Sequence, residues 1–129
     1  MPSQKRKFGD IGEKIAEEYL INKKYKILGR NYWKPWGEID LVTKKDNKLV
    51  FVEVKTRDAK NIENYLAEYS VNKNKIKRLQ KTCETYMWEN SISSGQEWQI
   101  DIIAVAIDKD SNKSTITNHI ENAIWEKRY

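Results

Sequence analysis

The sequence predicts one mixed α/β domain with its elements in the order αβββαββ. Two segments have apolar residues at helical spacing, and five others are rich in β-branched and apolar residues. The chain of 129 residues is long enough for one core and too short for a second. We therefore treat residues 1–129 as a single domain in which helices flank a sheet, with residues 1–7 as a short basic tail.

The first predicted helix follows the tail. Asp10 to Glu13 has the form of a capping box, which would begin the helix. Apolar residues then recur at helical spacing at Ile11, Ile15, Ala16, Tyr19 and Leu20. We expect this helix to end near Lys24.

Three strands are predicted next. Residues 25–31 alternate as a strand does, and residues 32–37, which are rich in aromatics and contain Pro35 and Gly37, predict a loop. Residues 38–43 and 49–55 are rich in β-branched and apolar side chains, and the polar residues 44–48 are typical of a turn. We therefore predict a β-hairpin.

The second half of the chain predicts one helix and two strands. Residues 56–70 show little periodicity, whereas residues 72–90 have apolar positions at helical spacing. Residues 97–107 and 114–120 predict two strands joined by a turn and followed by a short amphipathic tail that contains Trp125.

The charge of the chain favours a polyanionic partner. There are 24 Lys and Arg residues against 19 Asp and Glu residues, which gives a formal charge of +5 and a pI near 9.2. The N-terminus carries charges where a signal peptide needs an apolar stretch. The longest apolar run, residues 102–107, is far below the roughly 18 residues that a membrane span needs. We expect no membrane contact.

The single cysteine and the single histidine exclude several kinds of site. Cys83 can form no intramolecular disulfide and no cysteine-based zinc site, and its place in the apolar stripe of the second helix is explained by core packing. His119 has no second histidine or cysteine at ligand spacing, so we expect it to be structural or exposed. A reducing, cytoplasmic setting fits this composition best.

A carboxylate interrupts the most apolar predicted strand. Residues 51–55 are apolar on both faces until Glu53, and strands of that kind usually lie in the middle of a sheet. Burying a carboxylate without compensation costs on the order of several kcal/mol. Glu53 therefore needs a cationic partner, a metal ion or an open cleft.

Asp40 is the predicted neighbour of Glu53. Side chains alternate along a strand, so Glu53 and Lys55 should share one face, as should Glu38 and Asp40. If the hairpin turns symmetrically about residues 46–47, Asp40 lies directly opposite Glu53. Opposed carboxylates have Cβ atoms about 5 Å apart and repel unless a cation lies between them.

A magnesium ion suits this pair. Hard cations take oxygen ligands from one or two carboxylates and complete their shell with water and substrate phosphate. Asp40 and Glu53 would supply the carboxylates, and the backbone carbonyl of Val54 is a further candidate ligand, with Mn²⁺ able to substitute for Mg²⁺. Lys55 would orient or deprotonate the attacking water, or neutralise charge on the phosphate. The alternative is a buried ion pair of Lys55 with Glu53 or Asp40 that has no catalytic purpose.

Other residues extend the candidate site. Glu13 lies at the margin of the buried face of the first helix and could reach the sheet, although support of Asp10 at the helix N-terminus explains it equally well. The second helix is basic, and Lys75 at the edge of its apolar stripe is our candidate for a phosphate contact. Trp33 and Trp36, interleaved with Lys34, either stack on unpaired bases or pack half-buried at the strand ends.

These residues carry a family resemblance. Gly37-Glu38-Ile39-Asp40 followed by residues 51–55 resembles the PD-(D/E)XK nuclease signature, with Asp40 as its first acid and Glu53-Val54-Lys55 as its second half. Further segments agree: Gly12-Glu13, residues 29–31, 37–42, 51–57 and 101–103, and Lys75. Together they resemble the YraN-like family of small bacterial proteins over nearly the whole length.

The resemblance implies a fold and a chemistry. The YraN-like family is similar in layout to archaeal Holliday-junction resolvases, which implies a restriction-endonuclease-like fold, Mg²⁺ and phosphodiester hydrolysis. By position, the site acids would be Glu13, Asp40 and Glu53, with Lys55 as the catalytic lysine and Lys75 as a phosphate contact. Asp101 also matches the family, and we read it as structural.

The sequence departs from the family at two positions. Ile76 replaces a glutamine that often follows the lysine matched by Lys75, and Trp36 occupies a position that is usually small or basic. These differences bear on substrate contacts more than on the metal site.

We therefore expect a metal-dependent nuclease that acts on DNA rather than RNA, with branched or repair intermediates among its substrates. The predicted catalytic residues are Glu13, Asp40, Glu53 and Lys55, the predicted metal ligands are Asp40, Glu53 and Val54, and the predicted nucleic-acid contacts are Lys34, Trp36, Arg57 and Lys75. One alternative is a non-catalytic nucleic-acid-binding module of nuclease fold that acts through a partner. Another is an interaction protein with structural salt bridges. Symmetric cutting of a four-way junction would require a homodimer, for which the sequence shows no self-complementary apolar patch.

Overall fold

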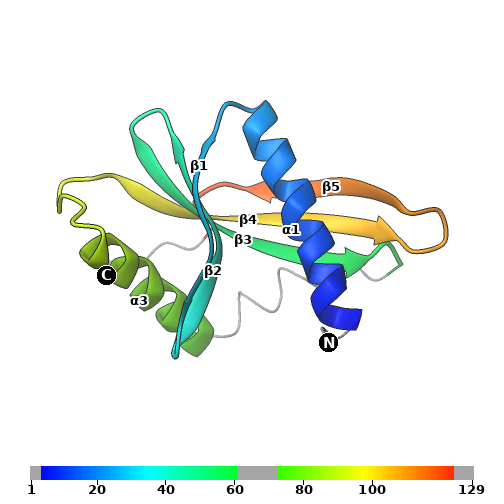
Figure 1. The fold of residues 1–129 in the computed structure, drawn as a ribbon, viewed down its shortest axis with the longest axis horizontal. Coiled ribbons are helices and arrows are strands. Elements are labelled where there is room, and N and C mark those ends of the chain that lie inside the picture. The colour runs from blue at the N-terminus through cyan, green and yellow to red at the C-terminus, as the bar shows by residue number, and fades with distance from the viewer. Residues whose placement is uncertain (1–3, 61–72, 124–129) are drawn as a thin grey trace.

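The structure is a computed structural model that describes residues 4–60 and 73–123 (Figure 1). The predicted order αβββαββ is confirmed: α1 (Gln4–Asn22), β1 (Lys26–Lys34), β2 (Gly37–Lys45), β3 (Lys48–Asp58), α3 (Lys73–Glu89), β4 (Trp98–Asp108) and β5 (Lys113–Ile120). The tail with Trp125 and most of the stretch 56–70 lie outside the described residues. Within the described ranges, no helix is long and apolar enough to cross a membrane.

The five strands form one mixed sheet in the order β1-β2-β3-β4-β5. Neighbouring strands are antiparallel except for β3 and β4, which run parallel and are separated in the sequence by α3. The strand that contains Glu53 is the third of the five, as its apolar composition predicted.

One helix covers each face of this sheet (Figure 1). Val52 of β3 packs in the same apolar cluster as Leu20 of α1, whereas its neighbour Phe51 packs in a second cluster with Leu79 of α3. Because successive side chains of a strand point to opposite faces, α1 and α3 lie on opposite sides of the sheet. Each of these buried side chains contributes about 1.5–3 kcal/mol to the free energy of folding.

The first helix begins earlier than the capping pattern predicted. It starts at Gln4, so most of the predicted basic tail is helical, and Asp10 lies inside the helix rather than at its N-cap. Asp10 instead pairs with Arg6 one turn earlier, at 3.7 Å. An ion pair at this spacing stabilises a helix modestly, and the basic residues before it are good helix formers.

The aromatic loop predicted for residues 32–37 is mostly strand. β1 runs on through Tyr32 to Lys34, and Lys34 pairs with Gly37, so the connection is a tight turn at Pro35 and Trp36. The aromatic side chains explain this outcome, because they favour strands when they can pack against a neighbouring helix. The β1–β2 pair therefore forms a long hairpin.

The β1 strand changes face at Asn31. Arg30 forms an ion pair with Glu17 of α1, but Tyr32, two residues further on, packs against the apolar cluster of α3. Residues two apart on a regular strand share a face, so the strand twists between them. Asn31 permits the twist because it adopts φ of 51°, a left-handed conformation that Asn tolerates better than most residues.

The first helix approaches the sheet most closely at Gly12. A Cβ atom on Gly12 would overlap the hydroxyl of Thr56 in β3 and lie 2.9 Å from the Thr56 Cβ atom. Gly9, three residues earlier on the same helix, has open space where its Cβ would be. Gly12 therefore sets the distance between α1 and β3, and with it the position of Glu13.

We predict that Gly12→Ala lowers the free energy of unfolding by about 1–3 kcal/mol, because the added methyl group forces α1 away from Thr56. Gly9→Ala is the matched control and should leave stability unchanged or raise it by up to about 1 kcal/mol, since alanine favours helix. Urea unfolding of both variants measures the difference. A Gly12→Ala protein as stable as Gly9→Ala would contradict the close approach.

Candidate functional site at a strand fork

β2 and β3 pair along only part of their length. Their last backbone pair is Leu41 with Val52, although β2 begins at Gly37 and β3 continues to Asp58. Figure 1 shows the strands separating there, so that the start of β2 stays with β1 while the end of β3 runs beside β4. We call this place the strand fork and define it by residues 37–40 of β2 and 53–58 of β3.

Asp40 lies at the fork. Ile39 packs in the cluster of α3 and Leu41 in the cluster of α1, although residues two apart on a regular strand share a face. β2 therefore changes face at Asp40. The alternation that would place Glu38 and Asp40 on one face breaks there. The Asp40 carboxylate Oδ2 accepts a hydrogen bond of 2.7 Å from the backbone N–H of Val54. It thereby replaces the main-chain carbonyl that a continuing ladder would supply.

The hairpin register places Glu53 next to Asp40. The observed pairs run from Lys45 with Lys48 to Leu41 with Val52, which is the predicted symmetric turn about residues 46–47. The pairing ends one step before Asp40 would lie opposite Glu53, but the charge of Glu53 raises the pKa of Asp40, so the two carboxyl groups are close. Glu53 is half-buried on the face that also carries Phe51, the face covered by α3.

The Val54 carbonyl also faces the fork. In a β-strand the N–H and C=O of one residue point to the same side. The N–H of Val54 is bonded to Asp40 of β2, so its carbonyl oxygen points away from β4 and towards the fork as well. This orientation is compatible with the predicted role of Val54 as a metal ligand.

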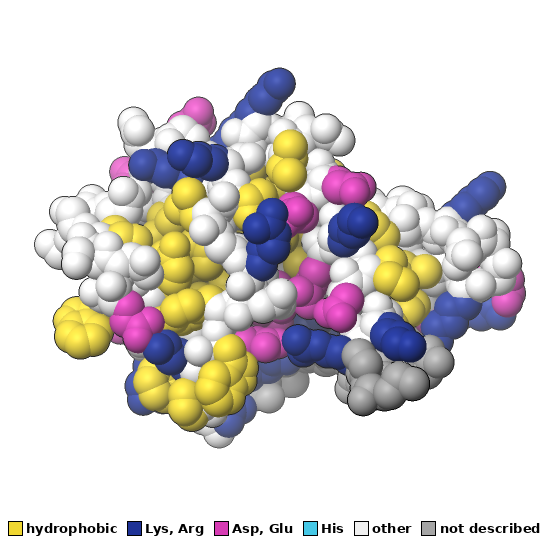
Figure 2. All heavy atoms as spheres, in the orientation of Figure 1, with side chains coloured by type: hydrophobic (Ala, Val, Ile, Leu, Met, Phe, Trp, Pro, Cys, Tyr) yellow, Lys and Arg dark blue, Asp and Glu magenta, His cyan; other side chains and the backbone are white. Residues whose placement is uncertain are grey.

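Four carboxyl groups influence one another at the fork. Burial, followed by the negative charge of Glu53, Glu13 and Glu38, raises the pKa of Asp40 well above its ordinary value, against the lowering effect of the Val54 hydrogen bond. On the face of the molecule drawn in Figure 2, acidic side chains gather near the middle, with basic side chains on either side of them. We call Glu13, Glu38, Asp40 and Glu53 the acidic cluster.

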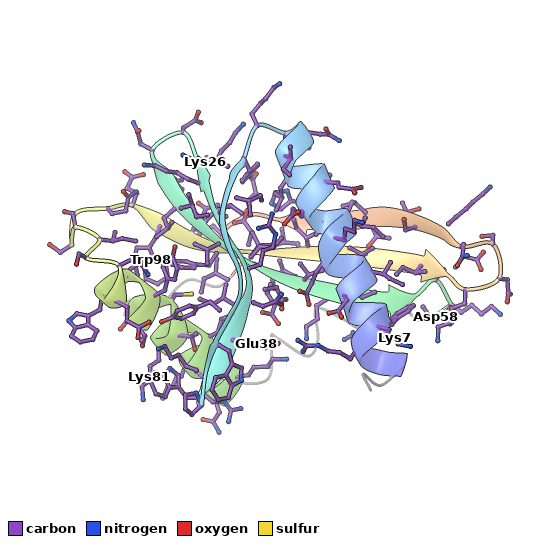
Figure 3. The ribbon with its side chains drawn as sticks, in the orientation of Figure 1. Lys7, Lys26, Glu38, Asp58, Lys81 and Trp98 are labelled. Atoms are coloured by element: carbon purple, nitrogen blue, oxygen red, sulfur yellow. The ribbon has the colours of Figure 1, made fainter. Side chains whose placement is uncertain are left out.

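Glu38 is the member of this cluster that the sequence did not single out as a site residue. It lies on β2 directly before Ile39 and is exposed (Figure 3). Its charge raises the pKa of both Glu13 and Asp40. The Gly37-Glu38-Ile39-Asp40 motif already contained it, so the signal was present in the sequence.

Glu13 reaches the cluster from α1. Burial raises its pKa to about 7, and the charges of Asp10, Glu38 and Glu53 add to the rise, while Arg6 opposes it. Glu13 also lines an open cleft of about 410 Å³ between α1 and the β1–β2 hairpin. The expected position at the edge of the buried face is therefore observed, whereas the role as support for an N-cap is not, because the helix begins at Gln4.

The predicted cations lie on two elements around the fork. Lys55 and Arg57 follow Glu53 at alternate positions of β3 and are half-buried, so they share its face. Arg57 also donates from Nη1 to the Thr56 carbonyl at 3.1 Å. Lys75 is half-buried in the first turn of α3. Their catalytic and phosphate-binding roles remain predictions.

Lys34 and Trp36 are held against α3. Lys34 Nζ lies 2.5 Å from Glu89 Oε2, and the Tyr32 hydroxyl donates to the same carboxylate. The ring of Trp36 has Lys81 Nζ above it at 4.5 Å from the centroid. These two residues therefore secure the hairpin tip to the helix, and their predicted contacts with nucleic acid stay predictions.

The donors at the fork suit a hard cation. The candidate ligands are all oxygen atoms, from Asp40, Glu53 and the Val54 carbonyl, which is the donor set that Mg²⁺ and Mn²⁺ prefer. Burial and the negative charge of Glu53 are the two largest causes of the raised pKa of Asp40, and a bound divalent ion would compensate both effects. Asp40, Glu53 and Val54 therefore fit the predicted metal by their chemistry.

A second group of ligand types lies elsewhere on the α1 face. Among the described residues, one set of three has ligand atoms within 4.8 Å of one another: Asp101, His119 and Glu121. His119 Nε2 lies 2.8 Å from Asp101 Oδ2, and its Nδ1 lies 2.9 Å from the Tyr19 hydroxyl. Both ring nitrogens are thus engaged in linking α1 to β4 and β5. This agrees with the structural roles expected for His119 and Asp101.

The fold and the fork define a small α/β protein with an acidic cluster where two strands part. The chain belongs to the uncharacterised protein family UPF0102, which matches residues 12–105, a range that includes Glu13, Asp40, Glu53 and Lys55. The resemblance to the YraN-like family is thereby confirmed.

Relatives of similar length support the assignment. A UPF0102 protein of Caldanaerobacter subterraneus subsp. tengcongensis is 38% identical over 119 residues, which cover 92% of this chain and 95% of the relative. One from Roseiflexus castenholzii is 31% identical over 126 residues, or 98% and 99% of the two chains. One from Syntrophomonas wolfei is 37% identical over 118 residues, or 92% and 97%.

The raised pKa of Glu13 predicts a pH-dependent stability. Between the unfolded value of 4.5 and the folded value of about 7, the native state binds more protons than the unfolded state, so stability falls as pH rises through this window. Glu13→Gln removes the titrating group. We expect the free energy of unfolding of Glu13→Gln, relative to that of the wild type, to be higher at pH 8 than at pH 4.5. Urea unfolding without divalent ions measures this difference. An increment that is the same at both pH values would contradict the raised pKa.

Proposed function

We propose that this protein is a metal-dependent nuclease that hydrolyses phosphodiester bonds in DNA. The observation that carries the proposal is the strand fork, where Asp40 is buried beside three further carboxyl groups and Lys55 follows Glu53 on the same face of β3. Stability alone does not account for such an arrangement, because apolar replacements of buried charges are often neutral or stabilising. The net charge of +5 supports a polyanionic substrate.

In this proposal Asp40, Glu53 and the Val54 carbonyl hold Mg²⁺, for which Mn²⁺ can substitute. Bound there, the ion would stabilise negative charge on the phosphate and lower the pKa of a water molecule. The Val54 N–H fixes one oxygen of Asp40 at 2.7 Å, which leaves the other oxygen of the carboxylate for the ligand. The orientation of Asp40 is therefore set by the backbone before any ligand arrives.

The remaining residues have separate tasks. Lys55 shares the face of Glu53 and would neutralise the charge that builds up on the phosphate during attack. Glu13, whose pKa of about 7 is close to neutral pH, would accept a proton from the attacking water. Arg57 and Lys75 would bind neighbouring phosphates along the strand.

The direct test is cleavage of labelled duplex, single-stranded and four-way-junction DNA in Mg²⁺, Mn²⁺ or EDTA. We expect cleavage that requires the metal and falls roughly 100-fold or more in Asp40→Asn, Glu53→Gln and Lys55→Met, because each removes a ligand or a cation needed in the transition state. Glu97→Gln is the matched control. Glu97 is exposed and lies beside Leu49 at the far end of β3, so this variant should cleave as the wild type does.

The outcomes separate the proposal from its rivals. Equal cleavage by all variants would show that a contaminating nuclease is responsible. Salt-sensitive DNA binding without cleavage would favour a non-catalytic nucleic-acid-binding module. Binding of neither DNA nor Mg²⁺ would contradict both.

A further inference from the structure

An exposed tryptophan lies beside the acidic cluster. The Trp33 side chain is 65% exposed at the end of β1, although indole rings usually bury most of their surface. Trp33 pairs directly with Glu38 across the β1–β2 hairpin. Directly opposed residues in an antiparallel pair have Cβ atoms about 4.5–5.5 Å apart and point to the same face. The ring is therefore next to one of the four carboxyl groups of the cluster.

Trp33 faces away from α3. Its neighbour Tyr32 packs into the cluster of α3, and its neighbour Lys34 is bound to Glu89 of that helix. Alternation along β1 then directs Trp33 to the opposite face, the one from which Glu13 reaches the fork. On that face the side chain is exposed.

The hairpin that carries Trp33 packs against α3 on the face opposite to the Trp33 side chain. Lys34 forms an ion pair with Glu89, and Lys81 lies over the Trp36 ring. A Cβ atom on Gly37 would be only 2.6 Å from the Thr82 hydroxyl, so the hairpin tip approaches the helix closely. The exposed indole is thus presented on a rigid element. Rigid aromatic rings bind flat partners at a low cost in conformational entropy.

We infer that Trp33 stacks on an unpaired base of the DNA, so that the substrates bear at least one unpaired nucleotide next to the bond that is cleaved. This inference rests on the proposed function and names its substrate class. Every base offers a flat face for stacking, whereas the bases of a continuous duplex are already stacked on one another. Glu38, the pairing partner of Trp33, belongs to the acidic cluster, so Mg²⁺ held at the fork would bring the scissile phosphate close to the stacked nucleotide.

The test measures binding without cleavage, in Ca²⁺, by fluorescence anisotropy. The probes are a blunt duplex, the same duplex with a short single-stranded flap, and a flap whose nucleotides nearest the branch lack bases. We expect the wild type to prefer the intact flap and Trp33→Ala to bind it at least about fivefold more weakly, with little change on the blunt duplex. Trp33→Phe should retain most of the preference, because its ring still stacks.

Trp88→Ala is the matched control. Trp88 is 81% exposed on α3, on the other side of the sheet from Trp33, so its loss should leave all three affinities unchanged. Trp33→Ala should also bind the baseless flap as well as the wild type does. An equal loss of affinity on blunt duplex and flap, or no preference of the wild type for bases in the flap, would overturn the inference. Because binding is read without turnover, these results are distinct from a failure of the nuclease proposal.

Discussion

The hydrogen bond from the Val54 N–H to the Asp40 carboxylate is the constraint on which the site depends. It ends the backbone ladder between β2 and β3 without leaving a buried donor unsatisfied, which would cost about 1–3 kcal/mol. It also fixes a carboxylate in the opening between the strands, where a main-chain oxygen would otherwise lie. At the fork, the carboxylate of Asp40 therefore takes the place of a backbone hydrogen-bond acceptor, and a carboxylate can also bind a metal ion.

Packing on both faces of the sheet stabilises the strand fork and positions its side chains. Two apolar clusters, one under each helix, stabilise the sheet on both sides of the fork and offset the unfavourable proximity of its carboxyl groups. The absence of a side chain at Gly12 lets α1 approach β3, and this brings Glu13 to the same opening. On the other face, contacts of Trp36 and Lys34 with α3 hold the hairpin tip in place. Burial first, and then the charges of neighbouring carboxyl groups, raise the pKa values of Glu13 and Asp40.

The order of elements and the register of the central hairpin could be predicted from the sequence, because turn chemistry and alternation are local. The pairing from Lys45 with Lys48 to Leu41 with Val52 followed from symmetry about a short polar turn, and it brings Asp40 close to Glu53. The change of strand face at Asn31 could not be predicted, since it depends on the twist of a sheet packed between two helices. The sequence pattern also left open which of the two tryptophans packs against the protein. Trp36 lies against α3 beneath Lys81, about fifty positions later in the chain, whereas Trp33 is exposed.

The proposed binding of one divalent cation at the strand fork can be tested without requiring any activity, by a titration with Mn²⁺ followed by electron paramagnetic resonance. The account predicts one site in the wild type that is lost in Asp40→Asn and kept in Glu121→Gln, which alters the separate group at Asp101 and His119. Manganese binding that survives Asp40→Asn and disappears in Glu121→Gln would place the metal at that other group and contradict the account.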